Sequence, residues 1–136
     1  MCYFLYGAVN REINERDYKN IIQNSKYHFV PGDIADVNSC VANCDDNYRI
    51  TSAYCDCESA VGGKDIYNAE LKNWEELLLK FKTVPGIKYV LLSRNWWKDT
   101  NIKQETIHID DINIANFLAE IENNCLYKIY LYSKYY

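Results

Sequence analysis

Residues 68–93, NAELKNWEELLLKFKTVPGIKYVLLS, contain the two strongest structural signals in the chain. Within residues 68–82, apolar side chains recur at spacings of three and four from Trp74 to Phe81, which is typical of one face of an amphipathic helix. A Pro-Gly pair then ends the helix, and residues 87–93 are apolar on both alternating faces. We therefore predict a helix over 68–82 that leads into a central strand of a sheet.

The rest of the chain repeats these two patterns. Residues 2–9 are also apolar on both faces and predict a second central strand. We expect further strands over residues 27–30, 48–57, 104–109 and 126–132, and further helices over residues 15–24 and from Asp111 onward. Pro31-Gly32 and the polar stretch 33–47 predict a turn and a long loop.

This order of elements predicts a single α+β (mixed α/β) domain that spans residues 1–136. We expect one sheet of about five to six strands with three helices packed on it. Two strand–helix–strand units joined by a hairpin-like connection resemble a ferredoxin-like core, to which a further strand–helix–strand unit is added. Folds of this kind host many functions, so the topology by itself names none.

Composition limits the classes of protein to consider. The chain is 49% hydrophobic, is rich in tyrosine with thirteen Tyr residues, and has a net charge of −4. Phosphate neutralisation supplies most of the affinity for nucleic acids, so this acidic balance argues against a nucleic acid partner. The apolar runs are too short for a membrane span. The apolar N-terminus lacks a basic leader, so we expect a cytoplasmic protein in which thiols stay reduced.

Four of the six cysteines lie in CVANCDDNYRITSAYCDC, residues 40–57, with the spacing C-x3-C-x10-C-x-C. On a strand, Cys55 and Cys57 would point to the same face. Cys40 and Cys44 would be neighbours on a helical turn. Four thiolates brought together in this way suit tetrahedral zinc, with an iron–sulfur cluster as the less favoured occupant.

A second interpretation of the same cysteines stays open. Neither pair has the C-x2-C spacing common in zinc ribbons, and cysteine is often a plain buried residue of the core. Residues 33–58 also contain six acidic side chains against Arg49 alone. Such a setting raises thiol pKa values, which argues against a reactive thiol, so we assign no catalytic residue to this segment.

The second informative segment is Ser93-Arg94-Asn95-Trp96-Trp97, which follows the predicted central strand. Adjacent tryptophans cannot both face the core in extended structure, so Trp96 and Trp97 beside Arg94 are candidates for stacking an aromatic ligand or anchoring a partner. The alternative is that one Trp caps the core and the other rests on a helix.

Three further features carry weaker signals. In the last strand, Tyr130 and Tyr132 share a face beside Lys128 and form a candidate surface for a protein partner or a second copy of the chain. His108 has Asp110 on the same strand face and is a weak candidate for catalysis. Residues 59–64, SAVGGK, are a weak candidate for an anion-binding loop, with an ordinary connection as the alternative.

Together these patterns favour a small cytoplasmic binding or interaction protein with a four-cysteine structural metal site, zinc being the candidate ion. Its expected partners are a protein, a second copy of the chain or a small-molecule ligand. Two alternatives remain: a small thiol- or His-dependent enzyme with its site at the strand ends, and a regulatory or inhibitory subunit without metal.

Overall fold

A computed structural model of the chain describes residues 3–10, 14–22, 28–31, 46–51, 57, 59–96 and 103–132. Its strands are β1 (Tyr3–Val9), β2 (His28–Pro31), β3 (Asp46–Thr51), β4 (Tyr89–Trp96), β5 (Lys103–His108) and β6 (Cys125–Tyr130). Its helices are α1 (Glu15–Ile22), α3 (Glu70–Phe81), α4 (Ile114–Ala119) and the short 3-10 helix η1 (Ile109–Asp111). The α+β class expected from the sequence is confirmed.

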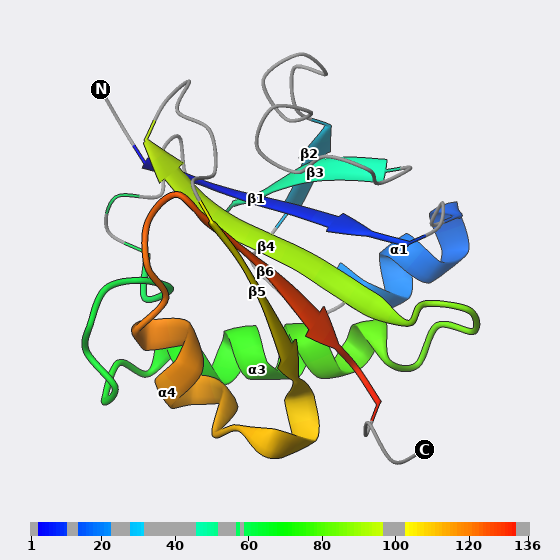
Figure 1. Ribbon diagram of the computed structural model, residues 1–136. Coiled ribbons are helices and arrows are strands. Elements are labelled where there is room, and N and C mark those ends of the chain that lie inside the picture. Colours follow the sequence, from blue (N-terminus) through cyan, green and yellow to red (C-terminus); the bar gives the residue numbers. More distant parts are fainter. Residues whose placement is uncertain are drawn as a thin grey trace.

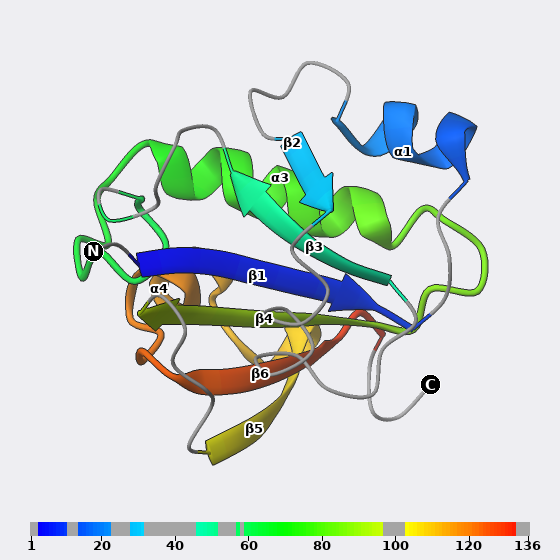
Figure 2. The ribbon, with the colours of Figure 1, turned by 90° about the horizontal axis from the view of Figure 1, so that it is seen from above.

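The strands form a six-stranded sheet in the order β2-β3-β1-β4-β6-β5, which Figure 2 shows from one edge to the other. The pairs β2–β3, β3–β1, β1–β4 and β4–β6 are antiparallel, whereas β5 and β6 are parallel. The parallel pair requires a crossover connection, which η1 and α4 supply.

The three described α-helices pack on one face of the sheet, and α3 and α4 lie below it in Figure 1. One core cluster unites Ile21 of α1, Trp74 of α3 and Leu118 of α4 with the sheet residues Leu5 and Val90. Helix α3 contributes most, because its five buried side chains follow the predicted helical spacing: Leu71, Trp74, Leu77, Leu78 and Phe81. This core fixes the position of β4 against α3.

The pairing of β1 with β4 is held at one end by Asn10. Its side-chain oxygen accepts the N–H of Lys88 at 2.7 Å, and its amide nitrogen donates to the carbonyl of Gly86 at 2.9 Å. These bonds join the end of β1 to the turn that starts β4.

None of the described helices is long and apolar enough to cross a membrane.

Candidate functional site

Arg94 occupies an uncommon position for an arginine, because its side chain is 7% exposed on the helix-covered face of the central strand β4. Burial of a charged group is costly unless it is hydrogen-bonded. Nη1 donates to Oδ1 of Asn123 at 2.6 Å, and Nη2 donates to the carbonyl oxygen of Cys57 at 3.3 Å. The guanidinium thus joins three segments that are far apart in the sequence.

Two aromatic rings extend this contact. The Tyr3 ring lies 4.2 Å from the guanidinium carbon of Arg94, within the range of a cation–π interaction. The same ring meets Trp96 edge to face at 4.6 Å, because Tyr3 and Trp96 are paired across β1 and β4. We call Tyr3, Cys57, Arg94, Trp96 and Asn123 the Arg94 cluster.

Cys57 is the member of the four-cysteine segment that the structure describes. Its thiol is exposed, and its sulfur accepts the backbone N–H of Tyr3 at 3.2 Å. Cys40, Cys44 and Cys55 lie outside the described residues, so the predicted convergence of four thiols stays a prediction. Within the described ranges, no three His, Cys, Asp or Glu side chains are grouped as a metal site.

The loop over residues 59–66 supports the Arg94 cluster from the side of α4. The backbone N–H groups of Gly62 and Lys64 donate to the carbonyls of Leu118 and Ala119, each at 2.8 Å. The ammonium of Lys64 donates to the carbonyls of Glu120 at 3.1 Å and of Ile121 at 3.0 Å. The loop therefore caps the C-terminal end of α4. A positive charge is favourable there, and Lys64 supplies it.

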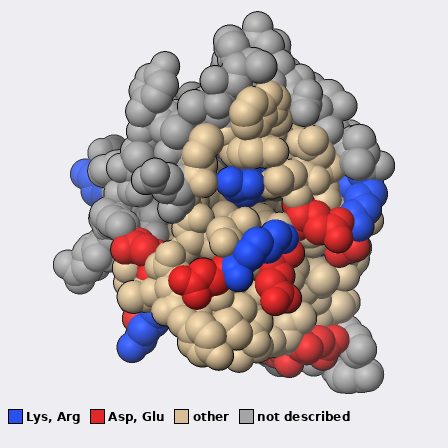
Figure 3. Space-filling view, turned by 90° about the vertical axis from the view of Figure 1, so that its left-hand side faces the viewer, with Lys and Arg blue, Asp and Glu red and all other residues tan. Residues whose placement is uncertain are grey.

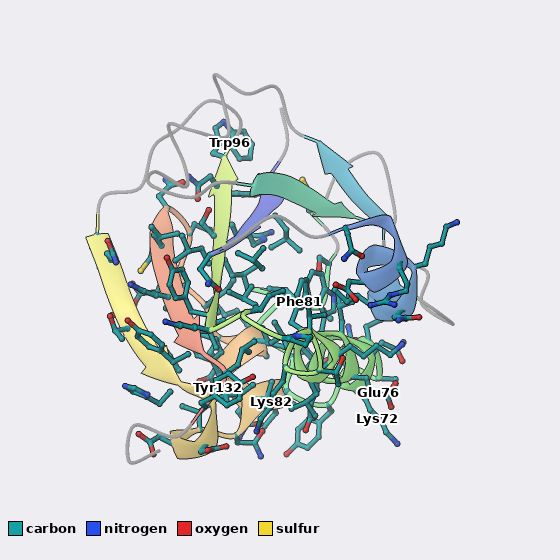
Figure 4. The ribbon with its side chains drawn as sticks, turned by 90° about the vertical axis from the view of Figure 1, so that its right-hand side faces the viewer. Lys72, Glu76, Phe81, Lys82, Trp96 and Tyr132 are labelled. Carbon is teal, nitrogen blue, oxygen red and sulfur yellow. The ribbon has the colours of Figure 1, made fainter. Side chains whose placement is uncertain are left out.

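The candidate partner residues lie in separate places. Figure 4 shows Trp96 at one end of β4 and Tyr132 beside Lys82 at the other end of the sheet. The Tyr132 hydroxyl donates to the Lys82 carbonyl at 3.3 Å, and its ring packs against the core. Tyr130 lies on the sheet face away from the helices, and Trp97 lies outside the described residues. Among the described candidates, Arg94 and Trp96 are brought together through the Tyr3 ring, which both of them contact.

His108 does not form the predicted pair with Asp110. Its ring stacks on Tyr130, with centroids 5.2 Å apart and an interplanar angle of 16°. Its Nδ1 is buried and has no hydrogen-bond partner within the described part of the chain. This geometry gives the imidazole a packing role.

The displaced pKa values are explained by burial and ion pairing. The ammonium of Lys103 lies 2.6 Å from Glu122 and 3.4 Å from Glu105. The hydrogen bond to Glu122 raises the pKa of Lys103, and the same bond lowers the pKa of Glu122.

Burial raises the pKa of the Cys125 thiol and raises that of Tyr127 to about 12. A buried thiol with a raised pKa is a poor nucleophile, so Cys125 is structural.

The described surface around Lys103 carries charges of both signs. Figure 3 shows basic and acidic side chains interspersed over the described part of that face. The pair of Lys103 and Glu122 is an example, because each charge is offset by its neighbour. A mixed surface of this kind does not favour a polyanion such as nucleic acid.

Comparisons with known proteins add no assignment. The sequence matches no protein-family model, and no curated protein or solved structure shows significant similarity to it. The function is therefore inferred from the geometry of the described residues.

The sequence patterns did not indicate two members of the Arg94 cluster, Asn123 and Tyr3, because neither belongs to a motif. Cys57 was predicted as a metal ligand through its sulfur, but the bond of its backbone carbonyl to Arg94 was not predicted. The available signal was Arg94 itself, since an arginine directly after a strand that is apolar on both faces needs hydrogen-bond acceptors from elsewhere in the fold if it is buried.

Proposed function

We propose that the protein is a small cytoplasmic binding protein, in which zinc held by Cys40, Cys44, Cys55 and Cys57 orders the segment that adjoins the Arg94 cluster. Its framework is a ferredoxin-like core, β1-α1-β2-β3-α3-β4, extended by β5, α4 and β6. The sheet order supports this description, because β3 lies between β1 and β2 and β1 lies between β3 and β4.

The hydrogen bond from the Tyr3 N–H to the Cys57 sulfur carries the proposal. Metal-bound thiolates are oriented and tuned by N–H donors of this kind in their outer shell. The bond fixes the Cys57 sulfur beside Tyr3 at the start of β1, where a bound ion would be anchored to the sheet.

The position of Arg94 supports the same site. Six acidic side chains and four thiolates in residues 33–58 carry a large negative charge, and Arg49 is the one base in that segment. Arg94 adds a second cation, because its guanidinium bonds the carbonyl of Cys57. Positive charge at this place offsets part of the negative charge that a four-thiolate site would bring together, and so supports metal binding.

Trp96 is the recognition element of the proposal, together with Trp97, which follows it in the sequence. Its ring is partly exposed and is held by Tyr3, which is in turn held by Arg94. An aromatic side chain fixed in this way loses little conformational entropy on binding, which is a property of interface anchors. The expected partner is a protein or a second copy of the chain.

Elemental analysis of protein purified without added metal tests the proposal. We expect one zinc per chain, with thiols of the segment that react with a colorimetric thiol reagent only after a chelator is added. Cys57→Ser should lose the zinc, and Cys2→Ser, a control outside the spacing motif, should keep it. Absence of stoichiometric metal, with the four thiols reacting freely, contradicts the proposal.

One observation favours a thiol-dependent enzyme as the second candidate function. The Cys57 thiol is exposed and receives an N–H donor, and both features assist a nucleophile. Alkylation by iodoacetamide at neutral pH separates the two candidates. A thiol that reacts faster than free cysteine, and that Cys57→Ser removes, supports the enzyme, whereas protection by bound zinc supports the binding protein.

A further inference from the structure

The two edges of the sheet differ in how they are protected from pairing with another strand. Strand β2 forms one edge, is four residues long and ends in Pro31, which has no N–H to donate. Strand β5 forms the other edge, is six residues long and contains neither proline nor glycine. Figure 2 shows β5 at the outside of the sheet, next to β6. The β5 edge therefore depends on its side chains for protection against pairing.

The outer edge of β5 is open to solvent. The residues from Lys103 to Thr106 are exposed, and the two that follow are partly exposed. Within the described part of the chain, β5 forms its backbone hydrogen bonds with β6 alone. An edge strand of this kind presents a row of N–H and C=O groups on its outer side, and these groups can bond a further strand.

The charged side chains of β5 complement those of a second, antiparallel copy of the same strand. Lys103 and Glu105 lie on one face, because side chains alternate along a strand. When Gln104 of one copy lies opposite Gln104 of the other, each Lys103 lies opposite the partner's Glu105. Directly opposite residues have Cβ atoms about 4.5–5.5 Å apart, whereas residues two apart on one strand are separated by about 6.6 Å. The Cβ atom of each lysine is thus nearer to the partner's Glu105 than to Glu105 of its own chain.

Other registers lack this match. Two copies related by a two-fold axis keep their helices on the same side of the sheet, so the axis passes between two equivalent residues. An axis at Lys103 or at Glu105 would place like charges directly opposite, which is destabilising. An axis at Thr106 would place each Glu105 opposite the apolar Ile107. The Lys103 ammonium has three N–H donors, so in the register centred on Gln104 it can keep its 2.6 Å contact with Glu122.

We propose that two copies of the chain associate through their β5 strands, antiparallel and centred on Gln104, into one sheet that joins the six strands of each copy. Backbone hydrogen bonds between the two edges supply the cohesion, and the two contacts between Lys103 and the partner's Glu105 fix the register. The interface uses the same surface of both copies and is closed, so it ends at a dimer. It involves neither Trp96 nor the four-cysteine segment, so it does not depend on the metal site proposed above.

Sedimentation equilibrium of the full chain between about 1 µM and 1 mM tests the proposal. We expect the average mass to rise with concentration from 16.0 kDa towards twice that value. Lys103→Glu and Glu105→Lys should each weaken association by about tenfold or more, because each substitution places like charges opposite each other. An equimolar mixture of these two variants should associate again, since every opposed pair then has one charge of each sign.

Two controls separate this surface from others. Lys72→Glu makes the same charge change on an exposed residue of α3, which Figure 4 shows on the side of the molecule away from β5, and it should associate like the wild type. Cys57→Ser, which removes a ligand of the proposed zinc site, should also associate like the wild type. Loss of zinc without loss of the dimer thus distinguishes the two proposals.

Single cysteine substitutions on β5 test the register. The two Gln104 side chains lie opposite each other in the proposed dimer, with Cβ atoms about 4.5–5.5 Å apart, so Gln104→Cys should form a covalent dimer when treated with oxidised glutathione. The two Thr106 residues lie four positions apart along the strands, about 13 Å, which a disulfide cannot span. Thr106→Cys should therefore give no more covalent dimer than the wild type, which carries the same native cysteines.

The proposal is overturned if the wild type stays monomeric up to about 1 mM, if charge reversal on β5 leaves association unchanged, or if the mixed variants do not associate. It is also overturned if Thr106→Cys forms the covalent dimer as readily as Gln104→Cys. Circular dichroism checks the fold of each variant. If Lys103→Glu, which also loses the contact with Glu122, does not fold, then Glu105→Lys and the two cysteine variants decide the outcome.

Discussion

Gly62→Ala is the most direct test of the buried Arg94. Gly62 has φ of +77°, a backbone conformation that costs a residue with a side chain about 1–2 kcal/mol. An added Cβ would also lie 2.7 Å from Cδ and 3.2 Å from Nε of Arg94, so the arginine must move. A displaced guanidinium loses its bond to Asn123, and a hydrogen bond of a charged donor contributes about 1.5–3 kcal/mol.

The two effects together predict that Gly62→Ala lowers the free energy of unfolding by about 2.5–5 kcal/mol, a large share of the roughly 5–15 kcal/mol of a typical domain. Urea unfolding followed by circular dichroism measures the change. The control is Gly86→Ala, where φ is +86° in an exposed turn, so that substitution should cost only the backbone term of about 1–2 kcal/mol.

A double-mutant cycle isolates the contribution of the arginine. In an Arg94→Ala background, Gly62→Ala should cost about 1–2 kcal/mol, because the group that obstructs the new Cβ is gone. Equal costs for Gly62→Ala and Gly86→Ala, or a cost at Gly62 that does not depend on Arg94, would refute the reasoning.

Two further predictions concern groups next to this cluster. The buried Tyr127 hydroxyl accepts the N–H of Glu122 at 2.8 Å, so Tyr127→Phe should lower the free energy of unfolding by about 1–3 kcal/mol in urea titrations. Because burial raises the Tyr127 pKa to about 12, its contribution is complete below the ordinary value near 10 and is lost as pH rises to 12. The wild type should therefore lose stability more steeply than Tyr127→Phe over that interval, and parallel curves would contradict the assignment. Lys64→Met should cost about 0.5–1.5 kcal/mol, since it removes the ammonium that caps α4, and an unchanged urea midpoint would show that the cap is not stabilising.

Strong periodicity made the central elements predictable. The helix expected over 68–82 is observed over Glu70–Phe81, and the strand expected over 87–93 is observed over Tyr89–Trp96. Local signals decide these elements, because the apolar stripe and the Pro-Gly pair act over a few residues.

The last helix was harder to place. We expected it to begin at Asp111, but η1 occupies Ile109–Asp111 and the Asn113 side chain caps α4 by accepting the N–H of Asn116. Asp and Asn are both good capping residues, so composition alone does not choose between them. Packing of Ile109 into the core decides the start.

The site depended on information that sequence patterns lack. Alternation along the last strand places Tyr132 beside Tyr130, but β6 ends at Tyr130 and Tyr132 contacts Lys82 after α3. The meeting of Arg94 with Cys57 and Asn123 follows from the sheet order and from the return of two loops. Neither the contact of Tyr132 with Lys82 nor the contacts of Arg94 can be predicted from spacing, because each joins residues that are far apart in the chain.

The sheet order has a consequence for how the chain folds. Strands β1 to β3 occupy one half of the sheet and β4 to β6 the other, so the halves meet only where β1 pairs with β4. That pairing joins Val9 to Val90 and Tyr3 to Trp96, and closing so long a stretch of chain is entropically expensive. The remaining pairs close shorter stretches within each half. We therefore expect the β1–β4 pairing to form late in folding, and α3, which lies between the halves in sequence and packs on both, to help bring them together.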